Sequence, residues 1–171
     1  YLARLMGYGV RHPKRRVLGT DIAGTVIALS EGVSGIDIGD EIVGFGTGAF
    51  AEIALMPAST AVHRPETISV DEAAAIPTTA VTALQAIRDA ARVEPGQHLA
   101  VIGASGGVGP FAVQIAKEYG AEVTGVASGR NADLVRSIGA DHVVDYATDD
   151  IATHTGRYDV IIDIVGNQPI R

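Results

Sequence analysis

The sequence contains no cysteine and no tryptophan, and only 5% of its 171 residues are aromatic. Without cysteine the chain can form no disulfide, and it has no thiolate to bind zinc, hold an iron–sulfur cluster or act as a nucleophile. A chain without disulfides fits a reducing compartment, so we expect a cytoplasmic protein.

Long apolar runs are also missing. The longest stretch without an acidic or basic side chain lies within 95–116, and glycines and a proline interrupt its middle. A membrane helix needs about 20 mostly apolar residues, so we expect no membrane span and no membrane partner. No basic segment followed by an apolar core marks a signal peptide.

Acidic side chains are missing from the first 20 residues. These 20 residues contain five of the 13 basic side chains. The rest of the chain contains the remaining eight basic side chains and all 20 acidic ones. Such an acidic body disfavours extended contact with a phosphate backbone, so we expect no nucleic-acid partner. The short basic segment is interpreted as a solvated loop; its members are Arg4, Arg11, Lys14, Arg15 and Arg16.

The first part of the chain has the pattern of a small β-structure. A hydrophobic content of 47% is typical of a globular chain. In residues 1–65 the apolar segments 21–29 and 49–56 are short and bounded by Gly, Ser and Pro, which predicts strands. The glycines at 44, 46 and 48 indicate tight corners of a small barrel, and a flexible loop is the alternative.

Helical signals follow this region. Ser69 and Glu72 have the spacing of a capping box, and Pro77 begins a second helical segment with one apolar face. We therefore expect one domain at 1–72 and a second domain at 73–171.

Strands and helices alternate from Gln97 onward. Apolar strands that alternate with amphipathic helices predict a parallel sheet covered on both faces. The expected strands are 98–102, 122–127, 142–144 and 158–165, and the expected helices end at residue 119 and span 131–138.

The sequence GASGGVG at 103–109 carries the clearest chemical signal. It follows a predicted strand and opens an amphipathic helix, which is the context of a dinucleotide-binding fingerprint. Gly106 would let a pyrophosphate approach the backbone, and Gly109 would let helix and strand pack closely. Free N–H groups and the helix dipole would stabilise the phosphate charge.

Other proteins use similar turns. A nucleotide-triphosphate P-loop ends in Gly-Lys-Ser/Thr, and this turn has no lysine. A serine hydrolase remains an alternative, because Ser105 stands in a G-x-S-x-G pattern that Asp141 or Asp145 and then His154 follow. A strand–helix junction without chemistry is the third interpretation.

The end of the second predicted strand indicates the cofactor. An NAD site usually has an acidic residue there, whereas this chain has Ser128, Arg130 and Asn131. The serine and asparagine can donate hydrogen bonds and the arginine can pair with a 2′-phosphate, so we expect NADP (as NADPH). The alternative is an ordinary helix start with a solvated arginine.

Metal sites and a short-chain dehydrogenase are not indicated. The five histidines show no H-x-x-x-H spacing, and we interpret them as surface or loop residues and expect no metal ligand. No tyrosine has a lysine four positions later, so the Tyr-x-x-x-Lys pair of short-chain dehydrogenases is missing.

Four segments together resemble the medium-chain dehydrogenase/reductase superfamily. The most similar branch is that of the zinc-independent NADPH quinone oxidoreductases, including the reticulon-interacting-protein-like enzymes. The segments are LGTDIAGTVIALSEGVSGIDIGDEIVG (18–44), AAAIPTTAVTALQAI (73–87), VIGASGGVGPFAVQIAK (101–117) and ASGRNADLVRSIGADHVVDY (127–146).

The resemblance implies an α/β chain in which a partial GroES-like β-barrel precedes a partial Rossmann domain, a doubly wound parallel sheet. It also implies where a cofactor would bind. Pyrophosphate would contact Ser105, Gly106, Gly107 and Val108, and the 2′-phosphate would contact Ser128, Arg130 and Asn131. Tyr146 would lie near the adenosine ribose, and Thr82 and Val165 near the nicotinamide.

This sequence departs from the superfamily at several places. Thr20 stands where zinc alcohol dehydrogenases have histidine, and FGTGAFAEIAL replaces their four-cysteine loop. Asn131 replaces a lysine common in the branch. Because the family pattern continues beyond both ends, we expect a fragment of a longer protein.

The resulting prediction is a zinc-independent oxidoreductase that transfers hydride from NADPH to a quinone or to an activated C=C or C=O bond. We assign no catalytic residue; Tyr8 and the 11–16 loop are weak candidates for substrate contact. The intact protein could be a homodimer. Alternatives are an NADPH-binding fragment without catalysis, since the fragment alone is expected to be inactive, and the Ser105 hydrolase.

Overall fold

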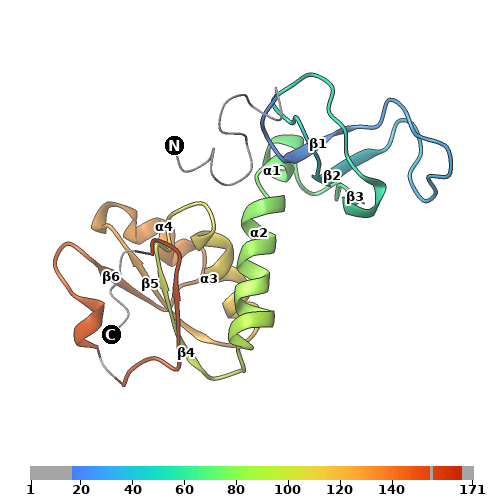
Figure 1. Ribbon diagram of the computed structural model, residues 1–171. Coiled ribbons are helices and arrows are strands. Elements are labelled where there is room, and N and C mark those ends of the chain that lie inside the picture. Colours follow the sequence, from blue (N-terminus) through green and yellow to red (C-terminus); the bar gives the residue numbers. More distant parts are fainter. Residues whose placement is uncertain (1–16, 155, 167–171) are drawn as a thin grey trace, which may run out of the picture. The chain divides into compact units, whose positions relative to one another are not determined.

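The computed structural model describes residues 17–154 and 156–166 (Figure 1). The basic segment and Tyr8 lie outside the described residues. Two compact units divide between Thr78 and Thr79, and the domain boundary expected after residue 72 stays a prediction. In the part described, no helix is both long and apolar enough to cross a membrane.

The first unit contains an antiparallel sheet in the order β1-β2-β3. The central strand pairs on both sides, with Gly44 opposite Ile22 and Val43 opposite Val62. A Cβ on Gly44 would lie 2.0 Å from the carbonyl oxygen of Thr60, so this glycine lets the turn before β3 approach the sheet. The strands are β1 (Asp21–Thr25), β2 (Glu41–Phe45) and β3 (Ala61–His63).

The strand expected at 49–56 is wrong. Within the described residues this segment joins no strand: it makes an isolated bridge between Thr47 and Leu55 and backbone hydrogen bonds to Leu18 and Gly19, and apolar side chains such as Phe50 are exposed. The central strand β2 is missing from the predicted strands, because the sequence pattern places a corner at Gly44, which lies inside this strand. β1 also ends earlier than expected, at Thr25.

The helical signals after residue 65 are confirmed. Ser69 and Glu72 form the capping box at the start of α1 (Val70–Ala74), with the Ser69 N–H donating to a Glu72 carboxylate oxygen at 2.8 Å. These hydrogen bonds hold the pKa of Glu72 below its usual range. The next helix α2 (Pro77–Leu84) begins at the proline and continues as a wider π-helical segment, η3 (Gln85–Ala91).

The second unit is built on a four-stranded parallel sheet in the order β6-β5-β4-β7 (Figure 1). The parallel sheet and its strands follow the sequence prediction within a few residues. Helix α3 packs on β4 and β5, and α4 packs on β5 and β6. The elements are β4 (His98–Ile102), α3 (Gly109–Glu118), β5 (Glu122–Ala127), η4 (Gly129–Asn131), α4 (Ala132–Ser137), β6 (His142–Asp145), η5 (Ile151–Thr153) and β7 (Val160–Asp163).

The two faces of this sheet have separate apolar clusters. Leu99 and Val101 point to the face covered by α3 and α4, where they pack with Val123 and Val135 in the larger core. Because side chains alternate along a strand, the next residues point to the other face. There Ile151 from the β6–β7 connection covers a smaller cluster of Ile102, Val126 and Val144.

One ion pair of the second unit links the end of α3 to β5 and to the residue before β6. Lys117 at the end of α3 donates to both carboxylate oxygens of Asp141, at 2.8 and 2.7 Å. The same carboxylate accepts the N–H of Val123 at 2.7 Å. Burial acts to raise the pKa of Asp141, but the hydrogen bonds from Lys117 and Val123 outweigh it and hold that pKa below its ordinary value.

The lowered pKa predicts a pH-dependent contribution to stability. Because the folded-state pKa lies below the unfolded value, the contribution is present above pH of about 4 and is lost as the pH falls through the folded-state value. Asp141→Asn should therefore lower the free energy of unfolding by about 1 kcal/mol at pH 7, since the pair is partly exposed. Urea unfolding of the intact protein measures this difference, which should shrink as the pH falls through the lowered pKa of Asp141.

Asp133→Asn is the matched control. Asp133 also pairs with a basic residue, Arg136, but is fully exposed, so its loss should change stability little at either pH. A loss for Asp141→Asn that is the same at pH 7 and pH 3 would contradict the assignment.

Candidate functional site

The turn after β4 holds its backbone close to the start of α3. Gly103 has a φ of +88°, which favours glycine, and the carbonyl of Val126 on β5 accepts the N–H groups of Gly103 and Ala104, both at 3.0 Å. A Cβ on Gly109 would lie 2.2 Å from the carbonyl oxygen of Gly103. The prediction that Gly109 allows close packing of helix and strand is confirmed.

The outer part of this turn is open to solvent. Gly106 and Gly107 are exposed, and Ser105 and Val108 are half-buried. The first N–H groups of a helix have no partner inside it. Pro110 is therefore tolerated in the first turn of α3, because the N–H that it lacks would have no partner in the helix. Backbone donors and the positive end of the helix dipole meet at this turn, so it can bind a phosphate group.

The turn after β5 contains the residues expected at a 2′-phosphate. Ser128 and Asn131 are half-buried and Arg130 is exposed, and in the described part of the chain no carboxylate pairs with this arginine. The side-chain amide of Asn131 donates to Ser105 Oγ at 2.9 Å. The structure therefore joins the turns after β4 and β5 directly.

An acidic residue at the same place was missed in the sequence. Asp145 ends β6 opposite Ala127, and a Cβ on Gly129 would lie 2.4 Å from Asp145 Oδ2. Its other carboxylate oxygen accepts the N–H of Ala147 at 3.0 Å. The preference for NADP rested on the lack of an acid at the end of β5, but the neighbouring strand supplies one. The sequence signal for this acid is the aspartate that ends the next strand along the chain, β6.

Two more of the expected residues lie beside these turns. Tyr146 is 66% exposed, and its N–H donates to the carbonyl of Ala127 at 3.3 Å, next to the turn after β5. Val165 follows β7, and a Cβ on Gly103 would lie 2.9 Å from Val165 Cγ2. Pairing of β7 with β4 thus brings Val165 to the glycine turn.

Helix α2 also reaches the glycine turn. The methyl group of Thr79 lies 3.6 Å from where a Cβ on Gly107 would be. Thr82 is exposed on the same helix, one turn further along. All the expected cofactor residues therefore lie on the glycine turn, on the turn after β5 or on segments that contact these turns.

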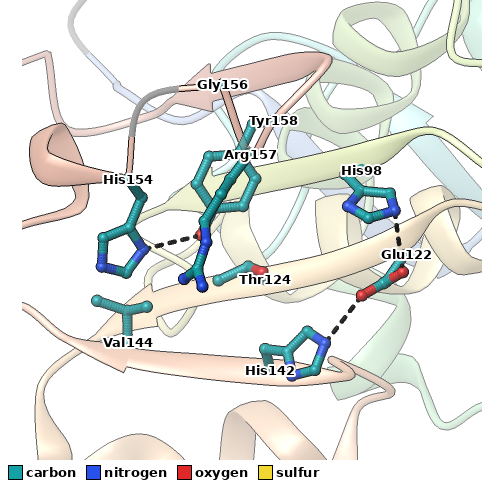
Figure 2. Close-up of a pocket in the computed structure, with 9 residues that line it drawn as sticks. All are labelled: His98, Glu122, Thr124, His142, Val144, His154, Gly156, Arg157 and Tyr158. Atoms are coloured by element: carbon teal, nitrogen blue, oxygen red, sulfur yellow. Dashed lines mark hydrogen bonds and ion pairs between the residues drawn. The ribbon is translucent and has the colours of Figure 1, made fainter.

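A cavity of about 580 Å³ lies over the other face of the sheet. Figure 2 shows Glu122 between two histidines, with its carboxylate oxygens 3.1 Å from His98 Nε2 and 2.9 Å from His142 Nε2. These three residues begin β4, β5 and β6. Ligands of open parallel sheets bind outside the carboxyl ends of the strands, so we do not assign the cavity to a nucleotide. Its other lining residues are Thr124, Val144, His154, Gly156, Arg157 and Tyr158.

The serine hydrolase alternative is not supported. Ser105 Oγ accepts from Asn131, and no hydrogen bond within the described residues joins it to a histidine. The ring nitrogens of His154 face Asp149 at 3.1 Å and the Tyr158 hydroxyl at 3.4 Å. Among the residues that the structure describes, Ser105 therefore has no catalytic contact with a histidine.

Two family models match the chain. Residues 3–66 match the alcohol dehydrogenase GroES-like domain, and residues 107–171 match the zinc-binding dehydrogenase domain. The two matches follow the order of the two expected domains.

Individual proteins show the same relationship. A chloroplast envelope quinone oxidoreductase homolog from Arabidopsis thaliana is 36% identical over 88% of this chain and 50% of its own length. The CurK enoyl reductase is 28% identical with a TM-score of 0.81, covering 93% of this chain and 50% of its own. Escherichia coli quinone oxidoreductase, solved in complex with NADPH, is 30% identical with a TM-score of 0.73. The match covers 80% of this chain and 43% of that protein's chain. The chain spans about half the length of the curated relative.

The close approach at the glycine turn can be tested by adding one methyl group. Gly109→Ala should lower the free energy of unfolding by about 2–3 kcal/mol, because the new Cβ would overlap the backbone of Gly103 and Ala104. Denaturant unfolding of the intact protein measures the loss. Gly24→Ala is the control, since a Cβ there meets nothing within 4 Å. Equal stabilities of the two variants would show that the approach is not close.

Proposed function

This chain belongs to the medium-chain dehydrogenase/reductase superfamily, in its quinone oxidoreductase branch, and we propose that the protein containing it is an NADPH-dependent reductase. The proposed reaction transfers hydride to a quinone or to an activated C=C or C=O bond. The observation that carries the proposal is the turn at 103–109, where exposed glycines and a helix start meet at the carboxyl end of a parallel strand. An enoyl reductase and quinone oxidoreductases among the similar proteins support this range of acceptors.

The described residues fit the parts of a dinucleotide. The backbone N–H groups of Gly107 and Val108 would bind the pyrophosphate, and Gly106, whose own N–H donates to the Gly103 carbonyl at 3.0 Å, would let the pyrophosphate approach. Ser128 and Arg130 would bind the 2′-phosphate, with Tyr146 beside the adenosine ribose. The Arg130 guanidinium favours this phosphate through charge-assisted hydrogen bonds, whereas the Asp145 carboxylate opposes it.

Bound NADPH would supply the hydride from C4 of its nicotinamide. The work left to the protein is to hold the ring and exclude water. Thr82 on α2 and Val165 after β7 both belong to segments that contact the glycine turn, and they would lie beside the nicotinamide. No residue of the described chain is assigned as the donor that stabilises the developing oxyanion.

The residues present do not fit the zinc of the superfamily's alcohol dehydrogenases. Thr20, at the position of a zinc-binding histidine, donates its hydroxyl to Asp21 at 3.2 Å, and Asp21 also accepts the Thr78 N–H at 3.2 Å. Structural and catalytic zinc sites use Cys, His and carboxylate ligands, and within the described residues no group of three such side chains could hold a metal ion. We therefore derive no step through zinc.

Two further expectations stay predictions. The cytoplasmic location is one, and a similar protein bears a name that places it at the chloroplast envelope. The homodimer of the intact protein is the other.

The reaction itself is tested with the intact protein and a panel of quinones and enones. Loss of NADPH absorbance at 340 nm should accelerate with at least one acceptor, and a chelator should leave that rate unchanged. Absence of NADPH oxidation with every acceptor would disprove the reductase. A rate abolished by the chelator would disprove zinc independence.

The cofactor preference is tested with two opposite charge changes. Arg130→Gln should weaken NADPH binding about 10- to 100-fold and leave NADH binding unchanged, because only NADPH has the 2′-phosphate. Asp145→Asn keeps an acceptor for the Ala147 N–H, removes the repulsion and should tighten NADPH binding by about 2- to 5-fold.

Fluorescence titration measures both nucleotides. Asp149→Asn, which removes an acid bound to His154, is the control and should change neither affinity. Tighter binding of NADH than of NADPH by the unmodified protein would disprove the NADP preference.

A further inference from the structure

The side-chain amide of Asn131 is placed with its nitrogen towards Ser105 Oγ. The Asn131 side-chain nitrogen is a donor and has no lone pair to accept with, so Ser105 Oγ is the acceptor at 2.9 Å. A hydroxyl that accepts one hydrogen bond still has its own hydrogen to donate. The Ser105 hydrogen must therefore point away from Asn131, towards another acceptor.

The surroundings of Ser105 indicate what that acceptor is. Ser105 precedes the two exposed glycines of the turn and the start of α3, where N–H groups and the helix dipole favour negative charge. An anionic oxygen at this turn would receive the Ser105 hydrogen together with backbone N–H groups.

Asn131 is itself held in place by its own turn. Its N–H donates to the carbonyl of Ser128 at 2.8 Å, and its side chain is half-buried. One side-chain hydrogen is committed to Ser105, which lies 26 positions earlier on a different turn. The amide therefore has the geometry of a bridge between two turns.

We infer that Asn131 is a positioning residue: it orients the Ser105 hydroxyl towards the pyrophosphate of the dinucleotide instead of holding the 2′-phosphate. The inference rests on the proposed function of the glycine turn. It predicts that loss of Asn131 affects every ligand with a pyrophosphate, whether or not the ligand has a 2′-phosphate.

Three ligands separate these roles in the intact protein. NADPH has both groups, NADH has only the pyrophosphate, and adenosine 2′-monophosphate has only the 2′-phosphate. Asn131→Ala should weaken NADPH and NADH by the same factor, about 5- to 10-fold, and leave adenosine 2′-monophosphate unchanged. Fluorescence titration gives the first two affinities, and competition against NADPH gives the third.

A double-mutant cycle tests whether Asn131 acts through Ser105. In a Ser105→Ala background, Asn131→Ala should cost less than about 2-fold in NADH affinity, because the hydroxyl that it orients is already absent. Ser137→Ala is the matched control on α4: it removes a hydroxyl that donates to the Leu134 carbonyl and should change no affinity.

The possible results are distinct. Weaker binding of NADPH and adenosine 2′-monophosphate with unchanged NADH would overturn the inference and place Asn131 at the 2′-phosphate. Equal weakening of all three ligands, or additive effects in the cycle, would overturn it in favour of a general structural role. An unmodified protein that binds none of the ligands would instead disprove the proposed function, and this inference with it.

Discussion

The close approach of α3 to the end of β4 is the constraint on which the rest of the second unit depends. Gly109 has no side chain, so the helix can begin against the carbonyl of Gly103. That position sets the helix start at the carboxyl edge of the sheet, where the first N–H groups of the helix have no partner inside it. The same Gly103 leaves room for Val165, so the turn also fixes how the segment after β7 passes the site.

Sequence patterns predicted the two units unequally. In the second unit, strands such as 98–102 are continuous apolar runs buried on both faces, and α3 has a regular apolar stripe, so pattern and burial agree. In the first unit the strands are short and partly exposed. There Gly44 lies within β2 because the Thr60 carbonyl approaches it, a tertiary contact that no local pattern shows.

The site was predictable where it depends on one segment and hidden where it depends on register. The fingerprint at 103–109 is contiguous, and the superfamily resemblance that it supports is confirmed. Asp145 reaches Gly129 because β6 pairs beside β5, and Glu122 meets two histidines because β5 pairs with β4 on one side and with β6 on the other. Composition and spacing do not contain such pairings, since they follow from strand order and alignment.

The carbonyl of Val126 serves two consecutive N–H groups, those of Gly103 and Ala104. A neighbouring strand thus anchors the entrance of the proposed phosphate-binding turn before any ligand binds. A preorganised loop loses little conformational entropy on binding, so more of the interaction energy is retained as affinity. In the proposed site the sheet would therefore contribute to binding through its backbone, while the Val126 side chain packs in the smaller cluster on the other face.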